Sequence, residues 1–254
     1  MVGGAASLLI RLRAVELATL LTALAVFGAV AEELPKLSER NAVFVAAIVV
    51  LPAFMATIWL ALPLARVRAN LLLIGAAAAG LAWVAFYFAG LGVASNLAKL
   101  TCFVLFGFWF LSLFEFLWWL GLVALAVPWI DIWSVATGPT RYVTEEQPQI
   151  FDNVSVALNV PGETATANIG PPDIVFFALF LAAGLRFHLR DALTWVCMTA
   201  FLSATLVIVW AFDSSGLPAL PAVCLGFLLP NADLLWRDVR DAYAAYAAGK
   251  EEAK

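Results

Sequence analysis

The chain has few charged residues, and this scarcity excludes most soluble classes of protein. Charged residues make up 13% of its 254 residues and hydrophobic residues 64%, whereas a soluble domain has about a quarter charged and roughly half apolar residues. A water-soluble core cannot bury so much apolar surface, so the chain needs lipid as its solvent. The net charge of −4 and the lack of basic runs argue against nucleic-acid binding.

Cysteine and histidine are also scarce. The three cysteines, Cys102, Cys197 and Cys224, all lie in apolar segments without paired spacing, and His188 is the single histidine. This pattern does not favour a disulfide framework or a zinc site. We therefore expect neither a metal nor a cofactor.

Long apolar stretches are what the chain does have. A membrane-spanning helix needs about 20 mostly apolar residues, and the following eight ranges qualify: 14–31, 42–65, 70–93, 97–115, 117–137, 171–186, 191–212 and 217–235. The stretch 97–137 is too long for one span, and Glu115 lies near its expected division. The sequence predicts an all-α, polytopic transmembrane bundle of eight to nine helices.

The N-terminus allows a second interpretation. Arg11 and Arg13 followed by an apolar stretch and Ala29-Val30-Ala31 are similar to a cleavable signal peptide. Glu16 within the apolar stretch favours a retained first helix instead. An interfacial ion pair with Arg13, one turn away, accounts for this carboxylate.

The distribution of Lys and Arg predicts the orientation. With eight spans, one side receives Arg11, Arg13, Arg66, Arg68, Arg186, Arg190, Arg237, Arg240, Lys250 and Lys254. The other side receives Lys36, Arg40, Lys99 and Arg141. Both termini are therefore expected in the cytoplasm, and the loop 138–170 outside.

Three regions follow from this arrangement. Residues 1–115 form a helical scaffold, residues 116–236 contain the candidate site and the loop 138–170, and residues 237–254 form a cytoplasmic tail. The charged start of the tail, with Asp238 and Asp241, is expected to be solvated and without a chemical role.

The loop 138–170 is the one sizeable hydrophilic segment, with Glu145, Glu146, Asp152 and Glu163. Residues 154–160 are rich in β-branched side chains, and Pro161-Gly162 is a turn signal. A short strand or hairpin and an ordered surface loop are both compatible with this pattern.

Two aspartates within or beside the apolar spans carry the functional hypothesis, because a carboxylate in a bilayer is costly. Asp131 lies about two turns before the outer end of its helix, and Asp173 begins the next, antiparallel span. Both are expected at similar depth in the outer part of the membrane. Pro218-Ala219-Leu220-Pro221, at the start of the last span, reaches the same level.

Two aspartates that face each other in a poorly solvated site cannot both ionise cheaply, so the pair is expected to share one proton. The charged member can take a proton from water, and the protonated member can donate one to a carbonyl oxygen. This is general acid–base hydrolysis of a peptide bond without a covalent intermediate.

Three segments together resemble the presenilin and signal-peptide-peptidase family of intramembrane aspartyl proteases. They are Asp131 with the downstream Gly138-Pro139, the segment Gly170-Pro171-Pro172-Asp173, and Pro218-Ala219-Leu220. The family places one aspartate after a tyrosine, a second in a Gly-x-Gly-Asp motif and a Pro-Ala-Leu motif in its last helix. The similarity covers about residues 117–235.

The resemblance implies Asp131 and Asp173 as the catalytic pair. It implies that Pro218, Ala219 and Leu220, with Gly170 and Pro172, shape the substrate site. The substrate would be a transmembrane peptide or protein, presented by the loop 138–170 as an extended strand. The predicted orientation is that of signal peptide peptidases, so substrates with a cytoplasmic N-terminus are expected. The protein itself is expected in a prokaryotic plasma membrane.

The sequence departs from the family pattern at three points. Ile130 replaces the tyrosine, Pro172 replaces the second glycine of the motif, and eight helices are found where the family has nine. A non-catalytic pseudoprotease that binds membrane segments therefore stays an alternative. A proton-coupled transporter that uses both aspartates is another.

Overall fold

The computed structural model describes residues 2–138, 142, 146–162, 167–212 and 217–252. It is an all-α bundle, and a long helix occupies each of the eight predicted ranges. The single helices are α1 (Val2–Val30), α4 (Ala69–Phe88), α5 (Gly92–Phe110), α6 (Leu117–Ala136), α9 (Pro171–Phe187), α10 (Asp191–Ala211) and α11 (Leu220–Glu252). The second range holds α2 (Glu39–Val45), a π-helical turn η2 (Ala46–Val50), α3 (Leu51–Ala61) and a 3₁₀ turn η3 (Leu62–Arg66) without a break.

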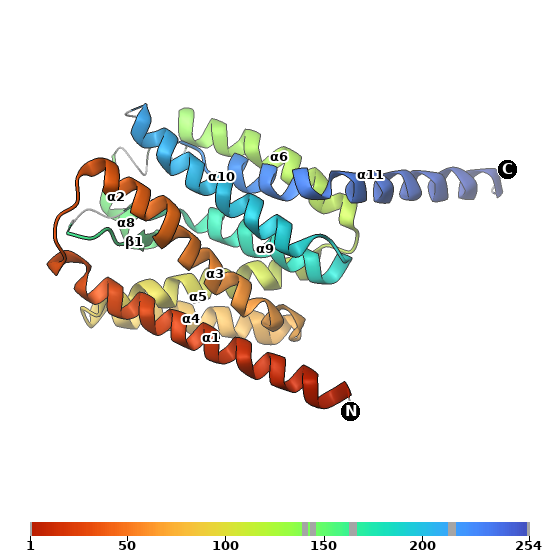
Figure 1. Ribbon diagram of the computed structural model, residues 1–254. Coiled ribbons are helices and arrows are strands. Elements are labelled where there is room, and N and C mark those ends of the chain that lie inside the picture. Colours follow the sequence, from red (N-terminus) through yellow and green to blue (C-terminus); the bar gives the residue numbers. More distant parts are fainter. Residues whose placement is uncertain (1, 139–141, 143–145, 163–166, 213–216, 253–254) are drawn as a thin grey trace.

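The helices confirm a polytopic membrane protein. Among the described residues, 6 helices are long and apolar enough to cross a membrane. They are α1, the continuous α2–α3 helix, α4, α5, α6 and α10. Figure 1 shows both chain ends at one end of the bundle, whereas α8 and β1 lie at the opposite end. An even number of membrane crossings gives this arrangement.

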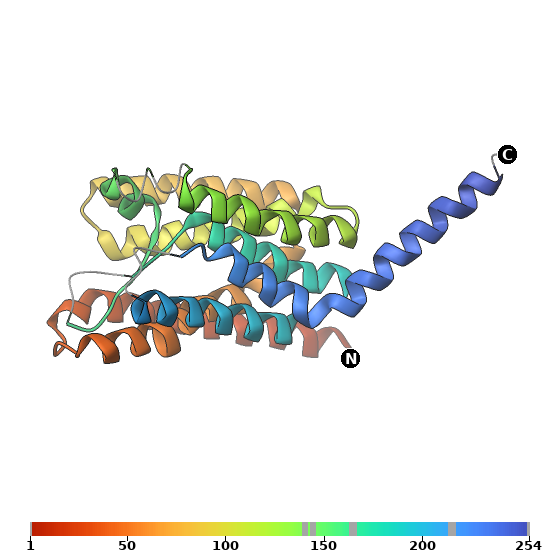
Figure 2. The same cartoon turned by 90° about the horizontal axis from the view of Figure 1, so that it is seen from above.

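The core of the bundle surrounds α9. Its residues Phe177–Ala183 have no solvent-accessible surface, and the two views place α9 between the other helices (Figures 1 and 2). Glycines allow the neighbouring helices to approach closely: a Cβ at Gly107 of α5 would lie 2.6 Å from the Val175 carbonyl oxygen. A Cβ at Gly226 of α11 would lie 2.5 Å from Cα of Met198 in α10.

The helix α6 is far less enclosed than α9. It packs mainly against α11 and touches α9 over a smaller area. Trp129, Ile130 and Trp133 on its other face are exposed. Exposed tryptophans near a helix end agree with anchoring at the membrane interface.

The loop 138–170 contains regular structure. A short helix α8 (Pro148–Val154) precedes β1 (Val156–Leu158), which pairs with β2 (Ala167–Ile169) in an antiparallel hairpin. The predicted strand within 154–160 is therefore confirmed, and the pairing favours the hairpin over an ordered surface loop without strands. Pro139, Arg141, Glu145 and Glu163 lie outside the described residues.

The expected division of 97–137 is confirmed, since the 3₁₀ turn η4 (Leu111–Leu113) ends before Glu115 and α6 starts at Leu117. Glu115 is exposed in this connection. The expected ion pair of Glu16 with Arg13 is absent from the described part of the chain. The Arg13 guanidinium instead lies 5.7 Å from the ring centroid of Trp59.

The expectation that the charged start of the tail is fully solvated is wrong for Asp238. This side chain is half-buried, and its Oδ2 accepts a hydrogen bond of 2.9 Å from the Trp118 N–H at the start of α6. The first N–H groups of a helix have no partner within the helix, so a carboxylate from a neighbouring helix can cap them. The tail is also continuous with α11, which runs on past the bundle (Figure 1).

Candidate functional site

Asp131 lies in α6, five residues before its end at Ala136 and three after Pro128. Its side chain is partly buried, and its Oδ2 accepts a hydrogen bond of 3.1 Å from the backbone N–H of Leu220. Leu220 is the first residue of α11. The positive end of the α11 dipole therefore points at a carboxylate of another helix, which stabilises negative charge there.

Asp173 lies in the first turn of α9, next to its N-cap residue Gly170. The carboxylate folds back over this residue. A Cβ added to Gly170 would lie only 3.0 Å from Asp173 Oδ2. It also interacts with the Gly170 backbone N–H. Each aspartate is thus held beside a backbone N–H at the start of a helix.

The Asp131 carboxyl group is close enough to Asp173 for its negative charge to act on the Asp173 carboxyl group. The Cys224 thiol, one turn after Leu220 in α11, is fully buried and within range of both. The structure therefore brings α6, α9 and α11 together at the level expected from the sequence. The depth argument gave no indication of Cys224, although its i+4 spacing from Leu220 places it on the same side of α11.

The residues around the pair occupy distinct positions. Pro218 and Ala219 are half-buried and immediately precede α11, and Leu220 is buried. Gly170 has a φ of −64°, so its backbone does not need the freedom of glycine. A Cβ at this position would be in tight contact with the Asp173 carboxylate, at 3.0 Å from its Oδ2, so glycine leaves room for the close approach of that side chain.

The two departures from the family motifs have a structural explanation. Pro172 is exposed in the first turn of α9, after Pro171. A helix tolerates proline there, because the first N–H groups have no partner within the helix. Ile130 is exposed on the outer surface of α6, so the position taken by a tyrosine in the family points away from the bundle.

The hairpin leads directly into the site, because β2 ends at Ile169 and α9 begins two residues later. Its position depends on two residues that the sequence interpretation did not select. Asn96 and Lys99 of α5 both bind the backbone around β1. Lys99 had been assigned only to the basic residues of the outer side, yet it lies two turns inside α5 and is buried.

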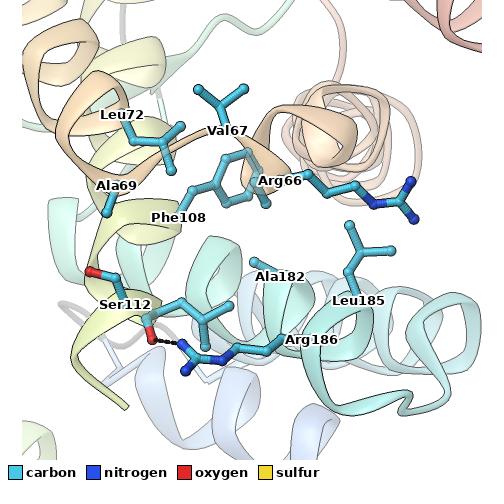
Figure 3. Close-up of a pocket in the computed structure, with 11 residues that line it drawn as sticks. Arg66, Val67, Ala69, Leu72, Phe108, Ser112, Ala182, Leu185 and Arg186 are labelled. Atoms are coloured by element: carbon cyan, nitrogen blue, oxygen red, sulfur yellow. Dashed lines mark hydrogen bonds between the residues drawn. The ribbon is translucent and has the colours of Figure 1, made fainter. Parts of the chain in front are cut away.

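Two cavities among the described residues lie away from the aspartates. One, of about 410 Å³, lies at the end of the bundle with the two termini, between Arg66, Ser112, Phe108 and Arg186. Figure 3 shows the two guanidinium groups pointing in opposite directions, and Arg186 donates to the Leu111 carbonyl oxygen at 2.9 Å. The other cavity, of about 340 Å³, lies beside the hairpin.

The arrangement is suited to moving protons. Two carboxyl groups within each other's field, each beside a backbone N–H, can hold one proton and exchange their roles as acid and base. Among the described residues, no group of three His, Cys, Asp or Glu side chains is placed to hold a metal ion. Comparison of the chain with protein-family models, with curated proteins and with solved structures finds no match, so the resemblance to intramembrane aspartyl proteases stays a prediction.

Proposed function

We propose that this protein is an intramembrane aspartyl protease that hydrolyses peptide bonds of transmembrane substrates through Asp131 and Asp173. The observation that carries the proposal is the meeting of three helix segments, distant in sequence, around two carboxyl groups. Leu220 donates to Asp131, and Asp131 lies within range of Asp173. Acidic residues inside a membrane protein are costly and are kept chiefly for function.

In the proposed reaction the pair shares one proton. The ionised carboxylate takes a proton from a water molecule as the water attacks the carbonyl carbon, and the protonated carboxyl donates to the carbonyl oxygen. The tetrahedral intermediate then collapses as the amide nitrogen is protonated. No covalent bond forms between protein and substrate.

The hairpin supports the same function. A transmembrane helix hides its peptide bonds in its own hydrogen bonds, so it must unwind locally before attack. An extended segment that adds to the hairpin regains backbone partners. Substrate must also reach the carboxyl groups between α6 and α9, and α6 has little contact with helices other than α11.

Two further parts of the proposal concern location and direction. We propose that the protein lies in a prokaryotic plasma membrane with the hairpin outside. The orientation rests on the numbers of basic residues on the two sides. Substrates whose N-terminus lies in the cytoplasm then enter with the polarity expected for signal peptide peptidases.

The proposal is tested with purified protein in liposomes and a fluorogenic transmembrane peptide. We expect Asp131→Asn and Asp173→Asn each to lower the cleavage rate by at least about 10³-fold, since the loss of one acid or base removes the shared proton. Asp241→Asn, an exposed aspartate of α11, is the matched control and should cleave at the unaltered rate. Cleavage that survives either site substitution would rule out the pair.

The same preparation distinguishes the protease from the second candidate, a pseudoprotease. Pro172 in place of the motif glycine favours this second candidate. A pseudoprotease binds the transmembrane peptide but releases no product at any pH. A transporter instead gives a proton or cation flux across the liposome that either substitution abolishes.

A further inference from the structure

The cavity of about 410 Å³ at the end of the bundle with the two termini has a charged rim. Arg66, Arg186 and Ser112 line it, and among the described residues no aspartate or glutamate does. Neither arginine forms an ion pair with a carboxylate of the part of the chain that the structure describes. Two positive charges on one small cavity, without a counter-charge from these residues, favour an anion from outside.

Arg186 is held in position through one of its donors. Its Nη1 donates to the Leu111 carbonyl oxygen at 2.9 Å, and Leu111 directly precedes Ser112. A guanidinium group has five N–H donors, so others remain for a ligand. Arg66 is exposed, and its guanidinium group points away from that of Arg186 (Figure 3). Because this side chain has no hydrogen-bond partner among the described residues, it can turn toward a ligand that Arg186 holds.

The buried wall of the cavity is apolar. Leu72 of α4, Phe108 of α5 and Ala182 of α9 belong to it, and each is at most 5% exposed. A charged rim beside an apolar wall fits a molecule with an anionic head and hydrocarbon chains. A small soluble anion buries no apolar surface against such a wall and gains nothing from it.

The rim lies at the level expected for lipid headgroups. The second membrane-spanning range ends at Arg66, the third begins at Ala69, and the fourth ends at Leu113, next to Ser112. Arg186 is the second-last residue of α9. Four segments thus bring the rim to one surface of the membrane, and basic pockets between helices at such a surface bind anionic lipid headgroups.

We propose that this cavity binds an anionic phospholipid from the leaflet on the side of the two termini. Arg186 and Arg66 contact the phosphate group, Ser112 donates to one of its oxygens, and a hydrocarbon chain runs along the apolar wall. The cavity is separate from Asp131 and Asp173, so the proposal does not rest on the protease function.

The test measures lipid binding to the full-length protein in a neutral detergent by native mass spectrometry. Phosphatidylglycerol is the anionic probe, and phosphatidylcholine, which has a phosphate group but no net charge, is the comparison lipid. We expect phosphatidylglycerol to bind at least about tenfold more tightly. Arg66→Gln and Arg186→Gln should each weaken its binding by about tenfold or more, because each removes a charge-assisted hydrogen bond to phosphate.

The variants differ in what else they change. Arg186→Gln also loses the bond to Leu111, whereas Arg66→Gln removes no side-chain contact with a described residue and therefore decides the test. Ser112→Trp places a bulky side chain at an exposed position of the rim and should block the lipid. The matched control is Arg237→Gln, an exposed arginine of α11 outside the cavity, which should bind the lipid as tightly as the unaltered protein.

A second measurement distinguishes a lipid from a soluble phosphate compound. Phosphatidylglycerol should raise the thermal unfolding midpoint of the unaltered protein but not that of Arg66→Gln, and inorganic phosphate at the same concentration should leave both midpoints unchanged. Equal binding of the two lipids, phosphatidylglycerol binding that survives Arg66→Gln or Ser112→Trp, and stabilisation by inorganic phosphate as large as that by the lipid each overturn the proposal.

Discussion

At the scale of single residues, buried polar side chains hold the helices of this bundle in place. Asn231 has no solvent-accessible surface. Its Nδ2 donates to Thr194 Oγ1 and to the Phe227 carbonyl oxygen, both at 2.8 Å, and its Oδ1 accepts from the Arg190 N–H at 3.1 Å. The residue directly follows Pro230 within α11, so it fastens this part of α11 to the start of α10.

Replacing this side chain should therefore be costly. Asn231→Leu leaves the Thr194 hydroxyl and the Arg190 N–H without their partner, and each unpaired group costs about 1–3 kcal/mol. We expect a clear loss of unfolding free energy. The measurement is a titration of the protein in mild detergent with a denaturing detergent, in which circular dichroism reports the loss of helix. Asn70→Leu, at an exposed position of α4, should change it by less than about 0.5 kcal/mol. Equal stability of the two variants would contradict this account of Asn231.

At the scale of elements, α6 is attached to the bundle chiefly through α11, and the two are joined near both ends. Leu220 donates to Asp131 at one end, and Asp238 accepts from Trp118 at the other. The second contact caps α6, and losing a capping acceptor costs about 0.5–2 kcal/mol.

The prediction for this pair of helices concerns Asp238→Ala. Its thermal unfolding midpoint should fall, and hydrogen exchange in the first turn of α6 should accelerate, while the midpoint of Asp241→Ala stays unchanged. Asp241 makes an exposed 3.7 Å ion pair with Arg240, and such pairs contribute about 0–1 kcal/mol. A similar response of both variants would show that the tail charges act only through solvent.

Hydropathy was enough to predict the eight long helices, because each needs an apolar run of fixed length. Depth along the helices was enough to bring Asp131, Asp173 and Leu220 to one level. The pairing of Asn96 with Ala157 and of Asp238 with Trp118 was not predictable, because these partners are 61 and 120 residues apart. Nothing local in the sequence marks such contacts. The helix α8 was missed because a seven-residue helix has no clear periodic pattern.

At the scale of the whole molecule, the two chain ends lie at one end of the bundle and the hairpin at the other (Figure 1). Because ten basic residues lie on the side of the termini and four on the other side, we expect the termini in the cytoplasm. A green fluorescent protein fused after Lys254 should therefore fluoresce, and a phosphatase that folds only outside the cytoplasm should be inactive at the same position. The reverse result would invert the bundle and the expected direction of substrates.

The exposed face of α6 has a consequence for how the protein meets its surroundings. Trp129, two residues before Asp131 and on the opposite face of the helix, is 75% exposed, so no other helix of the chain covers α6 on that face. A passing membrane segment can reach α6 by two-dimensional diffusion alone. For the proposed protease, bilayer thickness and fluidity would then be reaction conditions in their own right, as pH and temperature are for an enzyme in water.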